Sequence, residues 1–198
     1  EVKAKHGDDA VRELVAKAAG TLGVIVTVVT LLAMLGSPVI VAIFANGWFA
    51  DYLVEHGWFT NYLANGGDAA KFEQASTLLK ITFPYLWFIT FVALSGAVLN
   101  TYNKFAVAAF SPVLLNIAMI GAAIFLSPYT DSPATALAWG VFLGGLLQLL
   151  LQLPFLAKAG LLVLPRWAWH DEYIVRIRKL MLPALFGVSV SQINLLLD

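Results

Sequence analysis

Long apolar stretches without charge alternate with polar connections along this chain of 198 residues. Five of them are long enough to cross a bilayer as a helix, which takes about 20 apolar residues for a hydrocarbon core of roughly 30 Å. We place these spans at about residues 22–45, 78–99, 105–126, 134–156 and 180–198. None of the five shows the dyad alternation of a membrane β-strand, and an open strand edge is not stable in lipid. The pattern therefore predicts an all-α, polytopic transmembrane helical protein.

The composition supports a membrane protein. Hydrophobic residues make up 60% of the chain and charged residues 12%, against about 45–50% and about 25% in soluble domains. The 12 basic and 12 acidic residues cancel, which excludes a nucleic-acid binder that works through a global basic field. Cysteine is absent, so disulfides and thiolate metal sites are excluded as well.

The basic residues are distributed unevenly among the polar connections. Ten of the 12 lie before the first span, in the connection between the second and third spans (Lys104), or in the linker 158–179. Only Lys71 and Lys80 lie on the opposite side, together with five acidic residues. Because cytoplasmic loops of membrane proteins carry the excess of Lys and Arg, we expect the N-terminus of this chain and the linker 158–179 to be cytoplasmic.

Helix breakers occur in or at the ends of all five spans. A proline removes a backbone hydrogen bond and bends a helix, so each one is either a transporter hinge or a kink of the kind that membrane helices tolerate. Gly140 and Gly144 form a small-xxx-small pattern, for which we expect helix packing within the chain rather than dimerisation. The prolines are Pro38, Pro84, Pro112, Pro154 and Pro183.

Polar residues inside the spans are few. Gln148 and Gln152 are one helical turn apart and are expected to share a face, whereas a lone amide in the third span, Asn116, is expected to bond across helices. In the last span, Ser191, Asn194 and Asp198 are spaced i, i+3 and i+7. That stripe predicts either a wall of a watery cavity or ion site, or a hydrogen-bonded seam between helices.

Motifs of enzymes are absent from the sequence. It contains no His-Glu-x-x-His, no Gly-x-Ser-x-Gly and no phosphate-binding loop. The three histidines lie singly in predicted loops, without metal-ligand spacing, and no nucleophile and base are paired. We therefore expect no enzymatic activity.

Several blocks of sequence resemble one known family. They are LLKITFPY at 78–85, GAVLNTYNKF at 96–105, FSPVLLNIAMIG at 110–121 and LFGVSVSQIN at 185–194. In this order they resemble the MurJ (MviN) lipid II flippases of the multidrug/oligosaccharidyl-lipid/polysaccharide exporter superfamily. The resemblance is collinear over the whole chain.

The resemblance implies a transporter of about fourteen helices in two lobes. This chain would supply helices three to six and most of helix seven, with 1–179 in the N-terminal lobe and 180–198 at the start of the second. The implied function is to move lipid II from the inner to the outer leaflet of the bacterial plasma membrane by alternating access, with lipid II and membrane lipids as partners. The alternatives are a related drug or polysaccharide exporter, and a membrane assembly subunit without transport activity.

The resemblance also implies where the substrate site lies. The family's pyrophosphate-binding arginines are on helices one, two and eight, outside this chain, so no substrate-binding residue is assigned, and Arg166, Arg176 and Arg178 are expected to anchor the inner interface. Asp198 falls where some members hold a sodium ion on helix seven, which makes it the one candidate metal ligand. The chain begins at Glu1 without Met and stops at Asp198 inside an apolar run, so we expect a piece of a longer protein.

Overall fold

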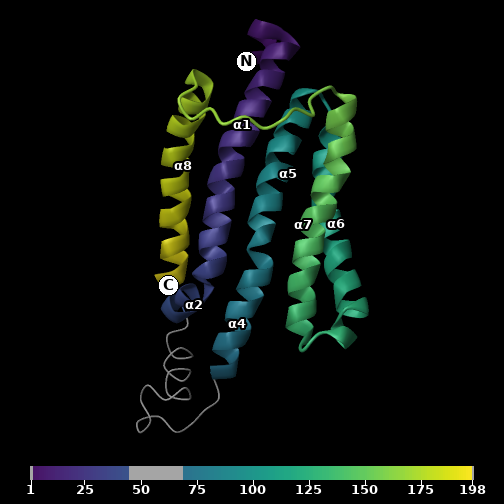
Figure 1. The fold of residues 1–198 in the computed structure, drawn as a ribbon, viewed down its shortest axis with the longest axis vertical. Coiled ribbons are helices and arrows are strands. Elements are labelled where there is room, and N and C mark those ends of the chain that lie inside the picture. Colours follow the sequence, from purple (N-terminus) through teal and green to yellow (C-terminus); the bar gives the residue numbers. More distant parts are fainter. Residues whose placement is uncertain (1, 45–68, 198) are drawn as a thin grey trace. The chain divides into compact units, whose positions relative to one another are not determined.

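A computed structural model describes residues 2–44 and 69–197 of the chain (Figure 1). Within these ranges all regular structure is helical, which confirms the predicted fold class. The elements in chain order are α1 (Val2–Leu35), α2 (Ser37–Phe44), α4 (Ala69–Thr82), α5 (Pro84–Thr101), α6 (Phe105–Phe125), the 3₁₀ turn η1 (Ser127–Tyr129), α7 (Pro133–Lys158) and α8 (Glu172–Leu197).

Four of the five predicted spans overlap with helices that are long and apolar enough to cross a membrane, although the first, 22–45, starts inside α1 and continues past its end into α2. These helices cover Gly7–Leu35, Lys71–Thr101, Phe105–Phe125 and Pro133–Lys158. The fifth predicted span, 180–198, lies on α8, but this helix begins at Glu172. The basic residues before the apolar run are therefore helical and do not belong to a loop, since the linker between α7 and α8 ends at Asp171.

The predicted helix breakers act in two different ways. At Pro84, the helical rod is divided into α4 and α5, and the Thr82 hydroxyl donates to the Leu78 carbonyl at 2.9 Å in the turn before the break. Near Pro38, α1 gives way to α2 at Gly36 while the backbone hydrogen bond from Ile40 to Gly36 is kept at 3.0 Å. In contrast, Pro112, Pro154 and Pro183 lie inside α6, α7 and α8 without dividing them.

The chain forms two compact units. The first unit combines Glu1–Val24 with Gly160–Asp198, and the second unit is Ile25–Ala159. Helix α1 contributes residues 2–24, which include all its charged residues, to the first unit and its apolar end, residues 25–35, to the second unit. The predicted lobe boundary between residues 179 and 180 concerns a longer protein and stays a prediction.

Small residues hold the helices of the second unit together. A Cβ atom at Gly140 would lie 2.9 Å from Ala122 Cβ, and one at Gly144 would lie 2.6 Å from Leu115 Cδ1, both on α6. On another face of α7, a Cβ at Gly145 would lie 2.9 Å from Phe88 Cβ on α5. The glycines thus let α7 approach two helices closely, and the small-xxx-small pattern packs within the chain as predicted.

Large apolar side chains of the second unit point outward. Leu32 on α1, Ile124 on α6 and Leu150 on α7 are 64%, 63% and 50% exposed, whereas Ala122 and Ala136 are 3% and 0% exposed. A soluble protein buries its large hydrophobic residues first. Small residues at helix contacts and large ones outside are typical of helices that pack in lipid.

The first unit joins α1 to an extended segment that follows α7. Gly160, with φ of 69°, adopts the left-handed conformation just beyond the end of α7, which glycine reaches at little cost. Farther along, the Arg166 amide donates to the Ala16 carbonyl at 2.8 Å, and the Ala168 amide donates to Thr21 Oγ1 at 3.2 Å. A Cβ at Gly20 would collide with the Arg166 backbone, so the segment lies directly on α1.

Candidate functional site

The predicted cavity and sodium residues lie at the end of the chain. The backbone of α8 includes Ser191 and Asn194, but their side chains and the whole of Asp198 fall outside the described residues. Their roles therefore stay predictions. In the part of the chain that the structure describes, no group of three or more His, Cys, Asp or Glu residues could hold a metal ion.

A buried polar cluster connects α6 and α7 in the second unit. Gln148 Nε2 donates to the Ser111 carbonyl at 2.8 Å, and Gln152 Nε2 donates to Ser111 Oγ at 2.9 Å. The two glutamines are 2% and 1% exposed and share one face of α7, as predicted. Such amides stabilise helix contacts in lipid, where an unpaired polar group is costly. The shared polar face of Gln148 and Gln152 therefore forms a hydrogen-bonded contact that holds α7 to α6.

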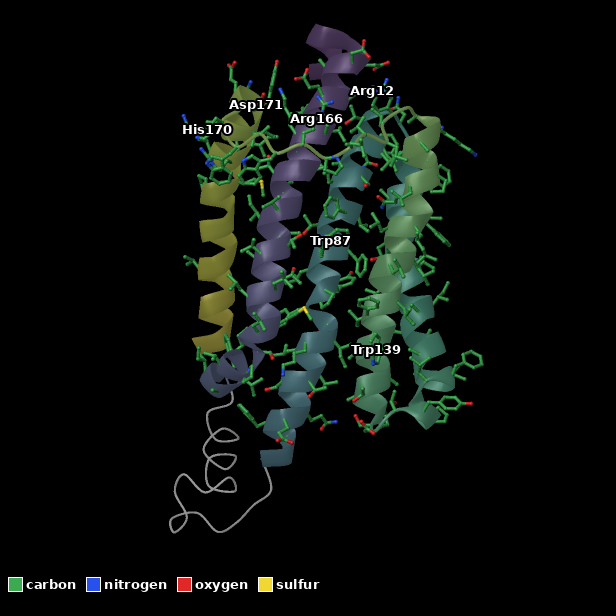
Figure 2. The ribbon with its side chains drawn as sticks, viewed as in Figure 1. Arg12, Trp87, Trp139, Arg166, His170 and Asp171 are labelled. Carbon is green, nitrogen blue, oxygen red and sulfur yellow. The ribbon has the colours of Figure 1, made fainter. Side chains whose placement is uncertain are left out.

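Two other polar residues of the second unit differ in their partners. Trp87 Nε1 donates to Thr27 Oγ1 at 3.0 Å and links α5 to the second half of α1 (Figure 2). Asn116, predicted to bond across helices, is exposed on α6 and makes no such bond to the described residues. Its mid-helix position alone did not reveal on which face of α6 it would lie.

Lys17 makes two ion pairs in the first unit, and one of them joins α1 to the residue before α8. Its ammonium lies 2.7 Å from Glu13 Oε1 on the same helix and 2.6 Å from Asp171 Oδ2, which is 154 residues away in sequence. The hydrogen bond from Lys17 holds the pKa of the Asp171 carboxyl below its ordinary value. Figure 2 shows Asp171 near the start of α8.

Asp171 has a second role as the cap of α8. Its Oδ1 accepts from the Tyr173 amide at 3.1 Å, and its carbonyl accepts from the Val175 amide at 2.8 Å. An N-cap of this kind satisfies an amide that the first turn leaves free. One side chain thus begins α8 and ties its start to Lys17 on α1.

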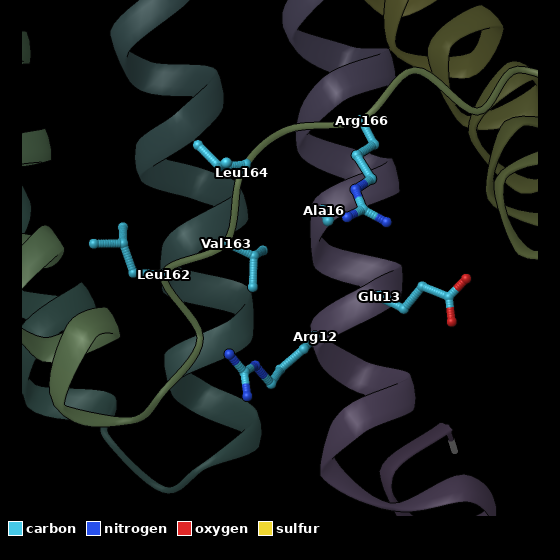
Figure 3. A pocket seen from close by; sticks show the side chains of 7 residues that line it. All are labelled: Arg12, Glu13, Ala16, Leu162, Val163, Leu164 and Arg166. Carbon is cyan, nitrogen blue, oxygen red and sulfur yellow. The ribbon is translucent and has the colours of Figure 1, made fainter.

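Two arginines line a pocket in the first unit. The pocket of about 470 Å³ lies between α1 and the extended segment, and we call it the Arg12–Arg166 pocket. Figure 3 shows the Arg12 side chain reaching from α1 toward the segment and the Arg166 side chain reaching from the segment along α1. The Glu13 carboxylate points away from Arg12 in the same view. Its lining residues are Arg12, Glu13, Ala16, Leu162, Val163, Leu164 and Arg166.

Aromatic residues precede α8 in the same unit. Trp167 and Trp169 are stacked, with ring centroids 5.8 Å apart and an angle of 5° between the rings. The Arg178 guanidinium lies 4.2 Å from the centroid of the Trp169 ring, within the range of a cation–π contact. The packing of Arg178 on Trp169 fixes the first turns of α8 to the end of the linker.

The family of the chain follows from a comparison over its full length. A family model described as lipid II flippase MurJ matches residues 2–198. The chain belongs to the MurJ family. As a member of this family with four helices long and apolar enough to cross a membrane, it is a multi-pass membrane protein.

Curated relatives carry the same family name. The probable lipid II flippase MurJ of Haemophilus influenzae is 64% identical, with 94% of this chain and 35% of that protein aligned. That of Vibrio cholerae is 63% identical, with 94% of this chain and 34% of that protein aligned. The lipid II flippase MurJ of Burkholderia cenocepacia is 37% identical over 100% of this chain and 36% of its own length. The chain thus spans about a third of the length of these MurJ proteins.

The chain contains two polar arrangements with different chemistry. Ser111, Gln148 and Gln152 are buried, and their hydrogen bonds join α6 to α7. The two glutamine Oε1 atoms have no partner among the described residues. The Arg12–Arg166 pocket is open and carries positive charge. Sequence reasoning missed this pocket because its two arginines are far apart in the chain, and because Arg166 was expected only to anchor an interface.

Proposed function

We propose that this chain forms part of a longer protein that moves lipid II, the lipid-linked peptidoglycan precursor, from the inner to the outer leaflet of the bacterial plasma membrane. The observation that carries the proposal is the match of residues 2–198 to the lipid II flippase family. The relative from Haemophilus influenzae, 64% identical and named a probable lipid II flippase, supports it. The activity is transport by alternating access and involves no covalent chemistry on the substrate.

The packing of the second unit suits a moving wall of a transport cavity. Gly36 and Pro84 mark irregular points in two long helical rods, and such points are places where a helix can bend. Beyond Pro84, α5, α6 and α7 are held by close glycine contacts. A rigid group of helices with bends in the rods beside it is the arrangement that rocking of one bundle requires.

The proposal includes an orientation. Lys104 lies between α5 and α6, and the basic residues of α8 lie in its first turns. We place both on the cytoplasmic side, together with the N-terminus of the chain. Asp131, between α6 and α7, is placed outside. Single cysteines at positions 104 and 131 of the longer protein, treated in intact cells with a membrane-impermeant thiol reagent, should be labelled at 131 only. Labelling at 104 alone would reverse the orientation.

The transport function is tested by complementation. The native flippase of a bacterium is depleted, and the full-length gene that contains this sequence is expressed in its place. We expect growth and normal cell shape to be restored. A protein that reaches the membrane in normal amounts and yet does not restore growth would contradict lipid II transport and favour a related exporter or an assembly subunit.

A sodium ion held in part by Asp198 remains part of the proposal. Sodium needs several oxygen ligands, so helices beyond this chain would supply the others. In the full-length protein, Asp198→Asn is expected to remove the thermal stabilisation that sodium gives over choline. Equal stabilisation of the variant and the unchanged protein would leave Asp198 with a packing role.

A further inference from the structure

One wall of the Arg12–Arg166 pocket follows a candidate membrane helix closely in the sequence. The extended segment that forms one wall starts just beyond Lys158, the last residue of the candidate span Pro133–Lys158. The other wall is the charged start of Gly7–Leu35, a helix of 29 residues, whereas about 20 apolar residues suffice to cross the hydrocarbon core. The first turns of α1 therefore extend beyond the hydrocarbon core, and the pocket is at the level of the lipid headgroups.

Positive charge in this pocket is not neutralised by its neighbours. The carboxylates of Glu13 and Asp171 form ion pairs with Lys17. Arg12 and Arg166 form no ion pair with any residue that the structure describes. Arg12 and Arg166 thus have no carboxylate partner among the described residues, and both guanidinium groups are available to an anion. Guanidinium binds phosphate through paired, charge-assisted hydrogen bonds.

Apart from Glu13, which pairs with Lys17, the rest of the pocket lining is apolar, and part of it is exposed. Leu162 and Leu164 on the segment are 56% and 84% exposed. The adjacent Trp167 is 57% exposed, and tryptophan is enriched where protein meets the headgroup layer. A soluble phosphate would use the arginines but leave these side chains in water. A ligand with both a phosphate and hydrocarbon chains would contact both parts of the pocket.

We infer that the Arg12–Arg166 pocket binds the phosphate group of a membrane lipid. Arg12 and Arg166 hold the phosphate oxygens from two walls, and the lipid chains lie along Leu162 and Leu164. The volume of about 470 Å³ is within the range of small-molecule sites, roughly 300–1,000 Å³. Two kinds of lipid carry this chemistry, a glycerophospholipid and a polyprenyl diphosphate. The inference does not depend on transport activity, because it concerns a site at the surface of the bilayer.

Native mass spectrometry of the delipidated full-length protein tests this site. The protein is titrated with phosphatidylglycerol, with undecaprenyl diphosphate, with diacylglycerol and with inorganic phosphate. We expect one or both phosphate-bearing lipids to bind, and diacylglycerol and inorganic phosphate not to bind measurably. The double variant Arg12→Gln/Arg166→Gln should weaken lipid binding by about tenfold or more, the effect of losing a charged hydrogen bond.

A matched control removes the same charge elsewhere. Lys104→Gln/Lys158→Gln also loses two cations at exposed positions of the second unit, just before α6 and at the end of α7, and should keep the affinity of the unchanged protein. Arg12→Lys/Arg166→Lys keeps the charge but loses the paired geometry, so we expect an intermediate affinity. If Arg12→Gln/Arg166→Gln has a lower thermal unfolding midpoint without lipid, its weaker binding could reflect a loss of fold. The lipid affinity of Arg12→Lys/Arg166→Lys then decides the test.

Each outcome has a defined consequence. Loss of binding in the arginine variant with normal binding in the lysine control supports the site, and the lipid that binds identifies the source of the phosphate. Equal loss in both variants means general attraction to surface charge and overturns the inference. Equally tight binding of inorganic phosphate overturns the lipid as the ligand. Failure of the complementation test with intact lipid binding would affect only the proposed transport.

Discussion

The contacts within the first unit of this chain differ in kind from the contacts within the second unit. In the second unit, α7 contacts α5 and α6 through glycines, and its polar residues Gln148 and Gln152 are buried in the helix contacts. In the first unit, α1 and the segment after α7 are joined by a backbone hydrogen bond, by a bond from the Ala168 amide to Thr21 Oγ1 and by the ion pair of Lys17 with Asp171. One unit depends on close contact between small residues, the other on polar bonds at its surface.

The difference follows from the surroundings of each unit. Between helices in lipid there is no hydrophobic driving force, so close van der Waals contact has to supply the stability. The Lys17 and Asp171 side chains of the first unit are 25% and 18% exposed, and ion pairs that water reaches contribute less because solvent screens them. We therefore expect substitutions in the helix contacts of the second unit to have larger effects than those in the first unit.

The largest effect is expected at Gly140. A Cβ atom there would lie 2.9 Å from Ala122 Cβ and 3.0 Å from Met119 Cα, so Gly140→Ala forces α6 and α7 apart. Overpacking of this kind costs about 1–3 kcal/mol. Thermal unfolding of the purified full-length protein measures the loss. In the control Gly121→Ala, the added methyl meets no described atom within 4 Å, and a loss as large as that of Gly140→Ala would contradict the packing argument.

An intermediate effect is expected in the buried polar cluster. Gln152→Met keeps the size of the side chain but removes the hydrogen bond to Ser111 Oγ, 2.9 Å long. Hydrogen bonds between membrane helices contribute about 0.6 kcal/mol on average, up to roughly 1.7 kcal/mol. Gln74→Met removes a bond of equal length to Ser132 Oγ at an exposed position and should lower the unfolding midpoint less. The opposite order would show that burial does not strengthen this bond.

The smallest effect is expected at the ion pair of the first unit. Asp171→Asn keeps a good N-cap for α8 but removes the charge that faces Lys17. Because the pKa of Asp171 is lowered in the folded protein, its charge stabilises the fold above the ordinary carboxyl pKa of about 4. This contribution is lost as the pH falls through the lowered pKa.

The measurement compares unfolding midpoints of the variant and the unchanged protein at several pH values. The unchanged protein should be the more stable at neutral pH, and the difference should shrink as the pH falls below about 4. High salt should also reduce it. Asp131→Asn, which removes an exposed carboxylate between α6 and α7, is the control. A difference for Asp171→Asn that stayed constant with pH would assign the effect to the cap alone.

Much of the helical architecture could be predicted from apolar length. The third and fourth spans, 105–126 and 134–156, agree closely with Phe105–Phe125 and Pro133–Lys158. The charged starts of α1 and α8 were harder to place, because the hydropathy pattern marks the hydrocarbon core and not the end of a helix. Thus α8 begins at Glu172, where Asp171 provides the cap, and not at the first apolar residue of the span.

Side-chain partners could be predicted only where they lie on one helix. The i and i+4 spacing gave the shared face of Gln148 and Gln152, but not the residue that accepts their hydrogen bonds, Ser111. The Arg12–Arg166 pocket depends on the path of the chain after Gly160, which places a distant segment on α1. Spacing in the sequence carries no information about that path.

The bond between Lys17 and Asp171 has a consequence for biosynthesis. The two residues are 154 positions apart, and chains elongate at about 5–20 residues per second. After Lys17 is added to the growing chain, roughly 8–30 s therefore pass before its partner is made. During this interval the helices of the second unit can enter the bilayer and pack, while the charged start of α1 waits at the membrane surface. The first unit thus closes last, when the linker behind α7 arrives.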